Sequence, residues 1–180
     1  MMNVLLEKQE SKAGFTHESQ SAKSIEWYTP KSIFDGLGCE FDMDVCAPEG
    51  GLPWIPAKKF LSLKDDGLTT PWNNDFVWCN PPYGKQTPMW LKKLQEHNNG
   101  IALVFSRTDC KWFFDYVVKA DLVLFLKGRV KFVDGQGDSG NNGAGNGSML
   151  VAYGAKAVKI LEESDLQGAR YYPEKEFNYV

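Results

Sequence analysis

The sequence lacks the patterns of several common protein classes. It has four cysteines but no C-x-x-C pair, and only two histidines, so we expect no structural zinc site and free thiols in a reducing cytoplasm. No apolar run approaches the ~20 residues that a membrane-spanning helix needs. The start, MMNVLLEKQESK, has neither a basic region nor a long apolar stretch, so a secretory signal is not expected.

What is present suits one globular domain in the cytoplasm. The chain has 180 residues, of which 43% are hydrophobic and 24% charged, and this length and composition fit a single core. Aromatic residues make up 13% and include six tryptophans, which leaves rings available to stack on a ligand.

Charge is unevenly distributed along the chain. The formal net charge is −3, which argues weakly against nucleic acid as a partner. Residues 84–131 nevertheless carry nine basic and four acidic side chains, a local excess of five positive charges. Such a block suits a surface that follows phosphates, and it equally suits lysines on solvated helix faces. Charge alone leaves both interpretations open.

Two segments predict irregular structure. Residues 1–24 are polar and without sustained periodicity, which is typical of a flexible arm. Residues 134–147 contain six glycines and predict a mobile loop, either a plain connection or a lid or binding loop. Residues 25–180 are expected to form one domain.

The ordered part begins with a predicted helix and strand. In YTPKSIFDGLG (28–38), Thr29 is expected to cap a helix that begins at Pro30 and ends at Gly38. The apolar face of this helix consists of Ile33, Phe34 and Leu37. In CEFDMDVCA (39–47), alternation predicts a strand with its acidic residues on one face. Its opposite face is expected to hold Phe41, Met43 and Val45.

Further apolar runs alternate with helical patterns. Strands are expected at 58–63, 76–79, 101–106, 121–126, 129–133 and 148–154, and helices at 88–97 and 110–120. Thr87 and Asp109 are the expected caps of the two helices. This alternation predicts an α/β domain with a largely parallel sheet.

The most unusual stretch is the turn Asn80-Pro81-Pro82-Tyr83, between the strand at 76–79 and a helix. Two consecutive prolines fix φ near −65° and donate no backbone hydrogen bonds, so the turn is stiff. Ligands of open parallel sheets bind beyond the carboxyl ends of the strands. Both this turn and the acidic strand at 41–44 are expected at that edge.

The turn matches the (D/N/S)-P-P-(Y/F/W) motif of S-adenosylmethionine-dependent amino-methyltransferases. The chain resembles the phage-type DNA N6-adenine methyltransferase family over roughly residues 25–153. Besides VWCNPPYG (77–84), the resemblance lies in EWYTP (26–30), FDMDVCA (41–47), DGLTTPW (66–72), WFF (112–114) and GRVKF (128–132). It implies an abbreviated class I methyltransferase domain, which is Rossmann-like, with S-adenosylmethionine as cofactor, DNA as partner and no metal.

The resemblance makes Asn80, Pro81, Pro82 and Tyr83 the catalytic residues. An adenine N6 amine is a poor nucleophile because its lone pair is delocalised into the ring. Acceptors such as the Asn80 side-chain carbonyl and the Pro81 backbone carbonyl favour a more sp3-like nitrogen and stabilise the charge that develops during attack. Tyr83 is expected to stack on a base flipped out of the helix, with core packing as the alternative.

The same resemblance assigns the cofactor contacts. Asp44, or Asp42 beside it, would receive the methionine ammonium of the cofactor. Asp66, or alternatively Asp65, would meet its adenine or ribose. The segment Tyr28-Thr29-Pro30 resembles the one that covers the methionine carboxylate, where N–H groups at a helix start suit an anion; a plain helix cap is the alternative.

One departure from the family pattern shortens the cofactor pocket. Many such enzymes carry a G-x-G-rich loop after the first strand, whereas the glycines here are displaced to Gly50 and Gly51. Only 35 residues separate Asp44 from Asn80, too few for the usual two strands and two helices.

The candidate phosphate contacts are Lys85, Arg107, Lys111 and Arg129. Phe132 is expected either to press on the target base or to pack in the core.

Three other functions remain open at this stage. The same chemistry would serve RNA or a protein glutamine amide. Asp42-Met43-Asp44 would suit the D-x-D metal site of a nucleotide-sugar transferase, which leaves the proline turn unexplained. A non-catalytic nucleic-acid-binding module that keeps the fold is the third.

Overall fold

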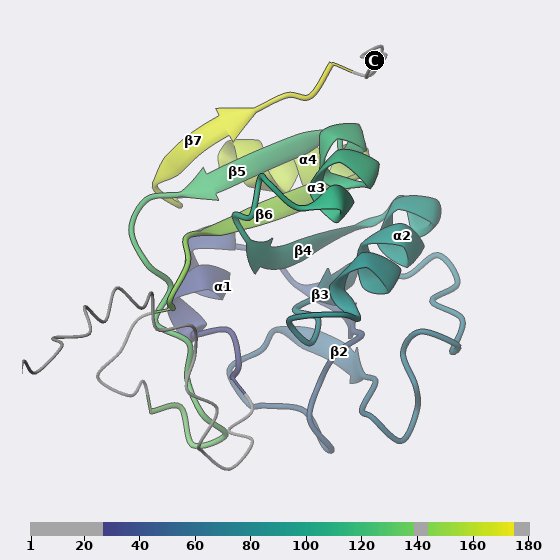
Figure 1. Ribbon diagram of the computed structural model, residues 1–180. Coiled ribbons are helices and arrows are strands. Elements are labelled where there is room, and N and C mark those ends of the chain that lie inside the picture. Colours follow the sequence, from purple (N-terminus) through teal and green to yellow (C-terminus); the bar gives the residue numbers. More distant parts are fainter. Residues whose placement is uncertain (1–26, 139–143, 175–180) are drawn as a thin grey trace, which may run out of the picture.

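The computed structural model describes residues 27–138 and 144–174. They form a seven-stranded sheet in the order β2-β1-β3-β4-β6-β5-β7, with helices on both faces (Figure 1). The strands are β1 (Phe41–Asp44), β2 (Ala57–Phe60), β3 (Val77–Cys79), β4 (Gly100–Phe105), β5 (Leu122–Leu126), β6 (Ser148–Tyr153) and β7 (Gly168–Tyr171). The predicted arm at 1–24 lies outside the described residues, as do residues 139–143 of the glycine-rich segment.

Half of the sheet is parallel and half is antiparallel. Strands β2, β1, β3 and β4 run parallel to one another, whereas β6 runs antiparallel to both β4 and β5, and β7 antiparallel to β5. The prediction of a largely parallel sheet is correct for β2, β1, β3 and β4 and wrong beyond β4. A parallel neighbour of β5 needs a long crossover, and the described residues between β5 and β6 contain no helix, so β6 returns antiparallel. This mixed α/β sheet is consistent with a Rossmann-like fold.

The helices cover the two faces of the sheet in pairs. Helices α1 (Lys31–Leu37) and α4 (Ala155–Glu163) lie on one face. Helices α2 (Thr87–His97) and α3 (Lys111–Asp115) lie on the other, together with the 3₁₀ turn η1 (Val117–Lys119), as Figure 1 shows. Among the described residues, no helix is long and apolar enough to cross a membrane.

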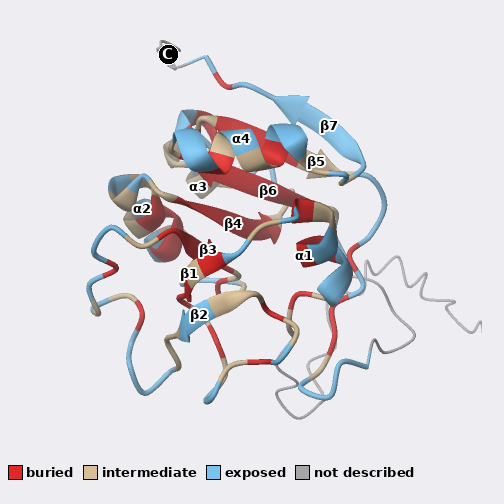
Figure 2. Ribbon diagram, turned by 180° about the vertical axis from the view of Figure 1, so that it is seen from behind, coloured by how far each residue is buried: buried red, intermediate tan, exposed pale blue. Residues whose placement is uncertain are grey.

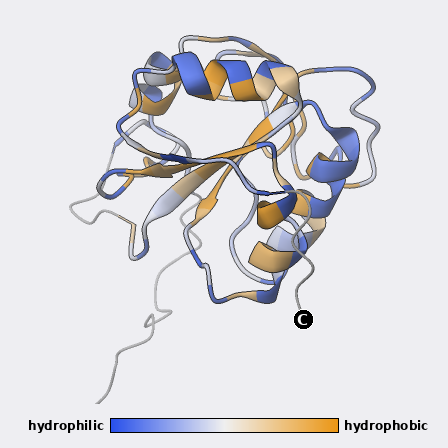
Figure 3. Cartoon of the chain, turned by 90° about the horizontal axis from the view of Figure 1, so that it is seen from above, coloured by the Kyte–Doolittle hydropathy of each residue, from blue (hydrophilic) through white to orange (hydrophobic). Residues whose placement is uncertain are grey.

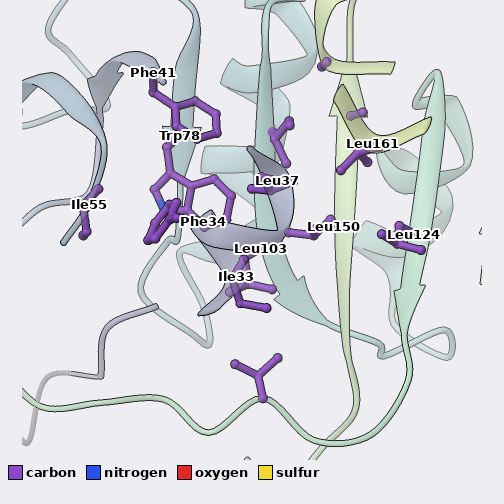
Figure 4. Close-up of a cluster of buried hydrophobic side chains, with 14 of the residues drawn as sticks. Ile33, Phe34, Leu37, Phe41, Ile55, Trp78, Leu103, Leu124, Leu150 and Leu161 are labelled. Carbon is purple, nitrogen blue, oxygen red and sulfur yellow. The ribbon is translucent and has the colours of Figure 1, made fainter. Parts of the chain in front are cut away.

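Each face of the sheet has its own hydrophobic cluster. In β4, Ile101 and Leu103 pack towards α1 and α4, whereas Ala102 and Val104 pack towards α2. This two-sided burial explains why the strand is a continuous apolar run. Figure 4 shows the first cluster, which includes Trp78, and Figure 2 shows the buried central strands beside the exposed edge strand β7. Apolar strands lie between helices with polar outer faces in Figure 3.

Strand β1 is irregular, and the predicted alternation of its side chains is wrong. The backbone amides of Asp42 and Met43 both donate to the Phe76 carbonyl, at 2.8 and 3.3 Å. Two residues of β1 therefore oppose the single residue Phe76, directly before β3, as in a β-bulge. Phe41 consequently packs in the α1/α4 cluster, while Met43 and Val45 pack in the α2 cluster.

Several element boundaries also differ from the predictions. Pro30 has an extended ψ of 150°, so α1 begins one residue later and Thr29 makes no side-chain cap. The helix expected at 110–120 is shorter and ends at Asp115. At its start, Cys110 is the cap residue, so the cap predicted at Asp109 is wrong. Residues 129–133 form no strand; they contribute one antiparallel bridge, from Val133 to Tyr28. The sequence reading assigned neither α4 nor β7.

The chain reverses its direction of travel across the sheet at β1. It passes from β1 to β2 on one side and then returns to β3 on the other side. Such a switch point leaves a crevice beyond the carboxyl ends of the two diverging strands, where ligands bind in open α/β sheets. Asp44 is the last residue of β1, and Asn80 follows β3 directly.

The buried side chains of the central strands should contribute most to the free energy of unfolding. Leu103 is fully buried, so we expect Leu103→Ala to lower the free energy of unfolding by about 2–5 kcal/mol, through lost transfer energy and a cavity. Urea unfolding measures this change. Leu63, which is 96% exposed, is the matched control; Leu63→Ala should change the stability by less than about 0.5 kcal/mol. Equal effects of the two substitutions would contradict the described core.

Candidate active site

A cavity of about 400 Å³ lies at the switch point. Its walls come from the segments that follow β1, β2 and β3, from the Trp27–Tyr28 segment and from the start of α2. The lining residues are Trp27, Tyr28, Val45, Cys46, Ala47, Pro48, Leu61, Ser62, Leu63, Asp66, Gly67, Leu68, Asn80, Pro81, Pro82, Tyr83, Gln86 and Trp90. The cavity therefore brings together the proline turn and two predicted cofactor residues, Tyr28 and Asp66, that are far apart in the sequence.

The proline turn is tied to the start of α2 by Thr87. The Thr87 hydroxyl donates to the Pro82 carbonyl at 3.2 Å and accepts from the Gly84 amide at 3.2 Å. Thr87 is 3% exposed, so its hydroxyl depends on these two bonds rather than on water. The predicted cap at Thr87 is wrong, because Gln86 is the cap residue; the hydroxyl holds the turn instead.

Two hydrogen bonds set the orientation of the Asn80 amide. Its Nδ2 donates to the Trp27 carbonyl at 3.4 Å, and its Oδ1 accepts the Tyr83 hydroxyl at 3.1 Å. A carbonyl oxygen has two lone pairs, so Oδ1 can accept a second donor. Asn80 therefore presents a fixed acceptor at the cavity wall.

Tyr83 is held by two phenylalanines that the sequence alone did not connect with it. Its ring stacks on Phe105 with a centroid distance of 4.0 Å and an interplanar angle of 13°, and Phe132 meets it edge-on at 5.8 Å. Burial raises the pKa of the Tyr83 hydroxyl above its ordinary value, so the group stays a neutral donor. Phe132 is 6% exposed and packs against Tyr83 in the core, the second of the two roles considered for it.

The two acidic residues of β1 have different surroundings. Asp44 is 2% exposed; its carboxylate accepts the Cys46 amide at 3.0 Å, and burial raises its pKa to about 7. Asp42 instead forms an ion pair with Lys58 at 2.8 Å and accepts the Phe76 amide. Neither carboxyl lines the cavity itself; the wall at this point begins with Val45, the residue after Asp44. Within residues 27–138 and 144–174, no three His, Cys, Asp or Glu side chains are grouped so that they could hold a metal ion.

The loop after β2 separates the other acidic pair. Asp66 lines the cavity, whereas the Asp65 carboxylate accepts both the amide and the hydroxyl of Ser62, at 2.8 and 2.7 Å. These bonds lower the pKa of Asp65. Of the two alternatives, only Asp66 faces the cavity.

Lys93 of α2 binds the backbone of the same loop after β2. Its ammonium donates to the carbonyls of Gly67, Leu68 and Thr70 at 2.6–2.9 Å. It also lies over the Trp72 ring, 4.4 Å from the centroid. Lys93 therefore fixes the cavity wall that carries Asp66, a role that the sequence did not indicate.

The segment Tyr28-Thr29-Pro30 is divided among different surroundings. Tyr28 lines the cavity. Thr29 is 1% exposed, and its hydroxyl oxygen has no hydrogen-bond partner. Pro30 lines a separate groove beside α1.

The basic candidates follow the carboxyl ends of three strands. Lys85, Arg107 and Arg129 are exposed in the segments after β3, β4 and β5. Lys111, at the start of α3, is engaged in an ion pair with Asp115 at 2.7 Å. The four residues thus lie at the same edge of the sheet as the cavity.

A stiff amide-proline-proline-tyrosine turn at the carboxyl edge of a sheet that is consistent with a Rossmann-like fold is the arrangement that the sequence motif of amino-methyltransferases predicts. Residues 15–164 match the family described as DNA N-6-adenine-methyltransferase (Dam), and the chain belongs to this family. The DNA N-6-adenine-methyltransferase of Haemophilus phage HP1 (strain HP1c1) is 25% identical over 140 residues, which cover 73% of this chain and 79% of that relative. No solved structure matches significantly.

These matches confirm the family that the motifs predict. The chain is therefore an enzyme of the DNA N6-adenine methyltransferase type, and the nucleotide-sugar transferase interpretation is wrong.

The tie between Thr87 and the turn can be tested directly. Thr87→Val keeps the shape but removes the hydrogen bonds to the Gly84 amide and the Pro82 carbonyl, each of which should contribute about 0.5–1.5 kcal/mol of stability. A loosened turn should also lower kcat by about tenfold or more, because small misplacements at reacting groups are expensive. Thr87→Ser, which retains the hydroxyl, should keep most of the activity. A valine variant with the kcat of the serine variant would refute the tie.

Proposed function

We propose that this DNA adenine methyltransferase binds S-adenosylmethionine in the cavity and transfers its methyl group to the N6 amine of a flipped adenine held at the proline turn. The observation that carries the proposal is that one cavity is bounded by the segment that follows β1, by Asp66 and by Asn80-Pro81-Pro82-Tyr83. A carboxylate for the cofactor and acceptors for the amine therefore lie at the same crevice.

The residues present fit the cofactor. Asp44 lies directly before Val45 of the cavity wall. It is a buried carboxylate that accepts the Cys46 amide and has a pKa raised to about 7, so a ligand ammonium would stabilise its charged form. Leu61 and Leu68 give the cavity apolar walls, which suit an adenine ring. When bound, S-adenosylmethionine supplies a methyl group activated by a sulfonium. Asp66 offers a carboxylate to the hydroxyls or amine of the nucleoside part.

Asn80 and Pro81 act on the amine of the target base. The Asn80 Oδ1 has an open lone pair, and its orientation is fixed by Trp27 and Tyr83. With the Pro81 backbone carbonyl it can accept both N–H groups of the amine. These acceptors favour a tetrahedral nitrogen and stabilise the positive charge that develops there. Because the turn is rigid, little reorganisation is needed when the base arrives.

Tyr83 provides the stacking surface for the flipped base. Phe105 covers one face of its ring, so the base would stack on the other face. Phe105 and Phe132 together hold the ring in place. An aromatic pocket offsets part of the cost of unstacking a base from the duplex.

We also infer that the fold is an abbreviated class I methyltransferase domain. The reversal of strand order between β1 and β3 supports this assignment, because Rossmann-like domains bind their ligands at such a switch point. Only β2 lies between β1 and β3 in the chain, and no helix is described there, which accounts for the short spacing from Asp44 to Asn80.

Nucleoside mass spectrometry on adenine-unmethylated DNA, incubated with the protein and S-adenosylmethionine, tests the reaction. Asn80→Ala should lower kcat at least about 10²–10³-fold, the usual effect of losing one preorganised polar contact to the developing charge. Cofactor binding, measured by calorimetry, should be nearly unchanged. The matched control is Asn74→Ala at an exposed position near the other end of β3, which should keep wild-type activity. Full activity of Asn80→Ala would refute the role of Asn80.

Cofactor affinity should depend on pH through Asp44. The pKa of this carboxyl is about 7 without ligand, and an ammonium beside it lowers the pKa, so binding below pH 7 must release a proton. Affinity should therefore rise by up to about tenfold per pH unit as pH increases towards 7, and then level off. Titration calorimetry between pH 5.5 and 8 measures this. Asp44→Asn should bind more weakly and lose the dependence; an unchanged pH profile in that variant would exclude Asp44.

A further inference from the structure

A second groove, of about 430 Å³, opens beside α1 and the segment that follows β5. We call it the basic groove. It is lined by Pro30, Ser32, Ile33, Leu126, Lys127, Gly128, Arg129, Val130, Lys131, Val133, Leu166 and Gln167. Three of these side chains are cationic and none is acidic, although the whole chain carries a net charge of −3. The groove is therefore a local site of positive potential.

The cations of the basic groove differ from seven lysines elsewhere in the described residues. Lys31, Lys58, Lys59, Lys64, Lys92, Lys111 and Lys159 all pair with a carboxylate. Within the described residues, no carboxylate forms an ion pair with Lys127, Arg129 or Lys131. Arg129 donates from Nη1 to the carbonyls of Ala144 and Gly145, which leaves its other N–H groups for a ligand.

The basic groove and the cavity share a wall. Tyr28 and Val133 exchange backbone hydrogen bonds at 2.8 and 3.0 Å; Tyr28 lines the cavity, and Val133 lines the basic groove. The same segment places Phe132 edge-on against Tyr83. The basic residues are thus joined through residues 131–133 to the ring that would stack on the target base.

We propose that the basic groove binds the sugar-phosphate backbone of the DNA substrate on one side of the target adenine. Lys127, Arg129 and Lys131 are the phosphate contacts, and Lys127 and Lys131 are contacts that the sequence did not single out. The inference rests on the proposed function, because it takes the target base to lie at Tyr83. The backbone from Lys127 to Phe132 reaches at most about 17 Å, which corresponds to about five base pairs at 3.4 Å each. The contact should therefore lie within about five base pairs of the adenine.

The salt dependence of DNA binding tests the inference. The variant K127Q/K131Q is compared with K119Q/K92Q, which removes two exposed lysines elsewhere. Lys119 precedes β5 and Lys127 follows it, so these two positions mark opposite edges of the sheet. Fluorescence anisotropy with one duplex between about 50 and 200 mM salt gives the slope of log K against log salt. Each lost phosphate contact should reduce its magnitude by about 0.9, so we expect a reduction of about 1.8 in K127Q/K131Q and none in K119Q/K92Q.

Duplex truncation locates the contact. On a duplex with a single target adenine, trimming one flank to two base pairs should raise the KM of the wild type for DNA, and trimming the other flank should raise it less. K127Q/K131Q should lose this asymmetry while keeping kcat at saturating DNA. An unchanged salt slope, an equal change in K119Q/K92Q, or a retained asymmetry would overturn the inference.

The measurements also separate this inference from the proposed function. If the wild type transfers no methyl group but K127Q/K131Q still loses about 1.8 in slope, the basic groove binds DNA and the proposed chemistry is wrong. If methylation proceeds and the slope does not change, the proposed chemistry is retained and the assignment of the groove is wrong. Binding by the wild type without salt dependence would likewise refute a phosphate contact.

Discussion

The parallel pairing of β1 with β3 is the constraint on which the site depends. Asp44 lies opposite Trp78 in this pair, and Asn80 is two residues further along the chain, directly after β3. Parallel strands deliver their carboxyl ends to the same edge of a sheet, so residues 36 positions apart in the chain meet at one crevice. A different register would put Asp44 and the proline turn out of reach of a common ligand.

Rigidity at this crevice comes from several independent sources. The two prolines restrict the backbone, Thr87 ties the turn to α2, and Phe105 supports Tyr83 from a neighbouring strand. On the opposite wall, Lys93 secures the loop that carries Asp66. The polar groups of the cavity are therefore oriented before any ligand arrives. Such preorganised groups stabilise a developing charge without the cost of reorientation.

Local patterns predicted much of this structure. The apolar runs that became β3, β4, β5 and β6 were recognisable because both faces of these strands are buried. The proline turn was recognisable because its residues are contiguous, and its sequence context identified the family. The order of the strands and the direction of β6 were not predictable, because they depend on pairings between distant segments and on a connection without a helix.

Within the site, the sequence could not decide between similar neighbours. Asp42 and Asp44 differ only because a bulge in β1 changes which way each side chain faces. Phe105 and Tyr83 are 22 positions apart, and nothing in the sequence marks their stacking. Thr87 was recognised as a polar residue at a helix start, but the groups that its hydroxyl binds are set by how the turn folds back.

Lys93 gives the loop after β2 the coordination that a bound cation provides in other proteins. Three carbonyl oxygens converge on its ammonium as they would on a calcium ion. A cation that is covalently attached to α2 cannot dissociate, be exchanged for another ion, or be removed by a chelator. The shape of this wall is therefore encoded in the chain itself, and it is complete as soon as α2 has packed against the sheet.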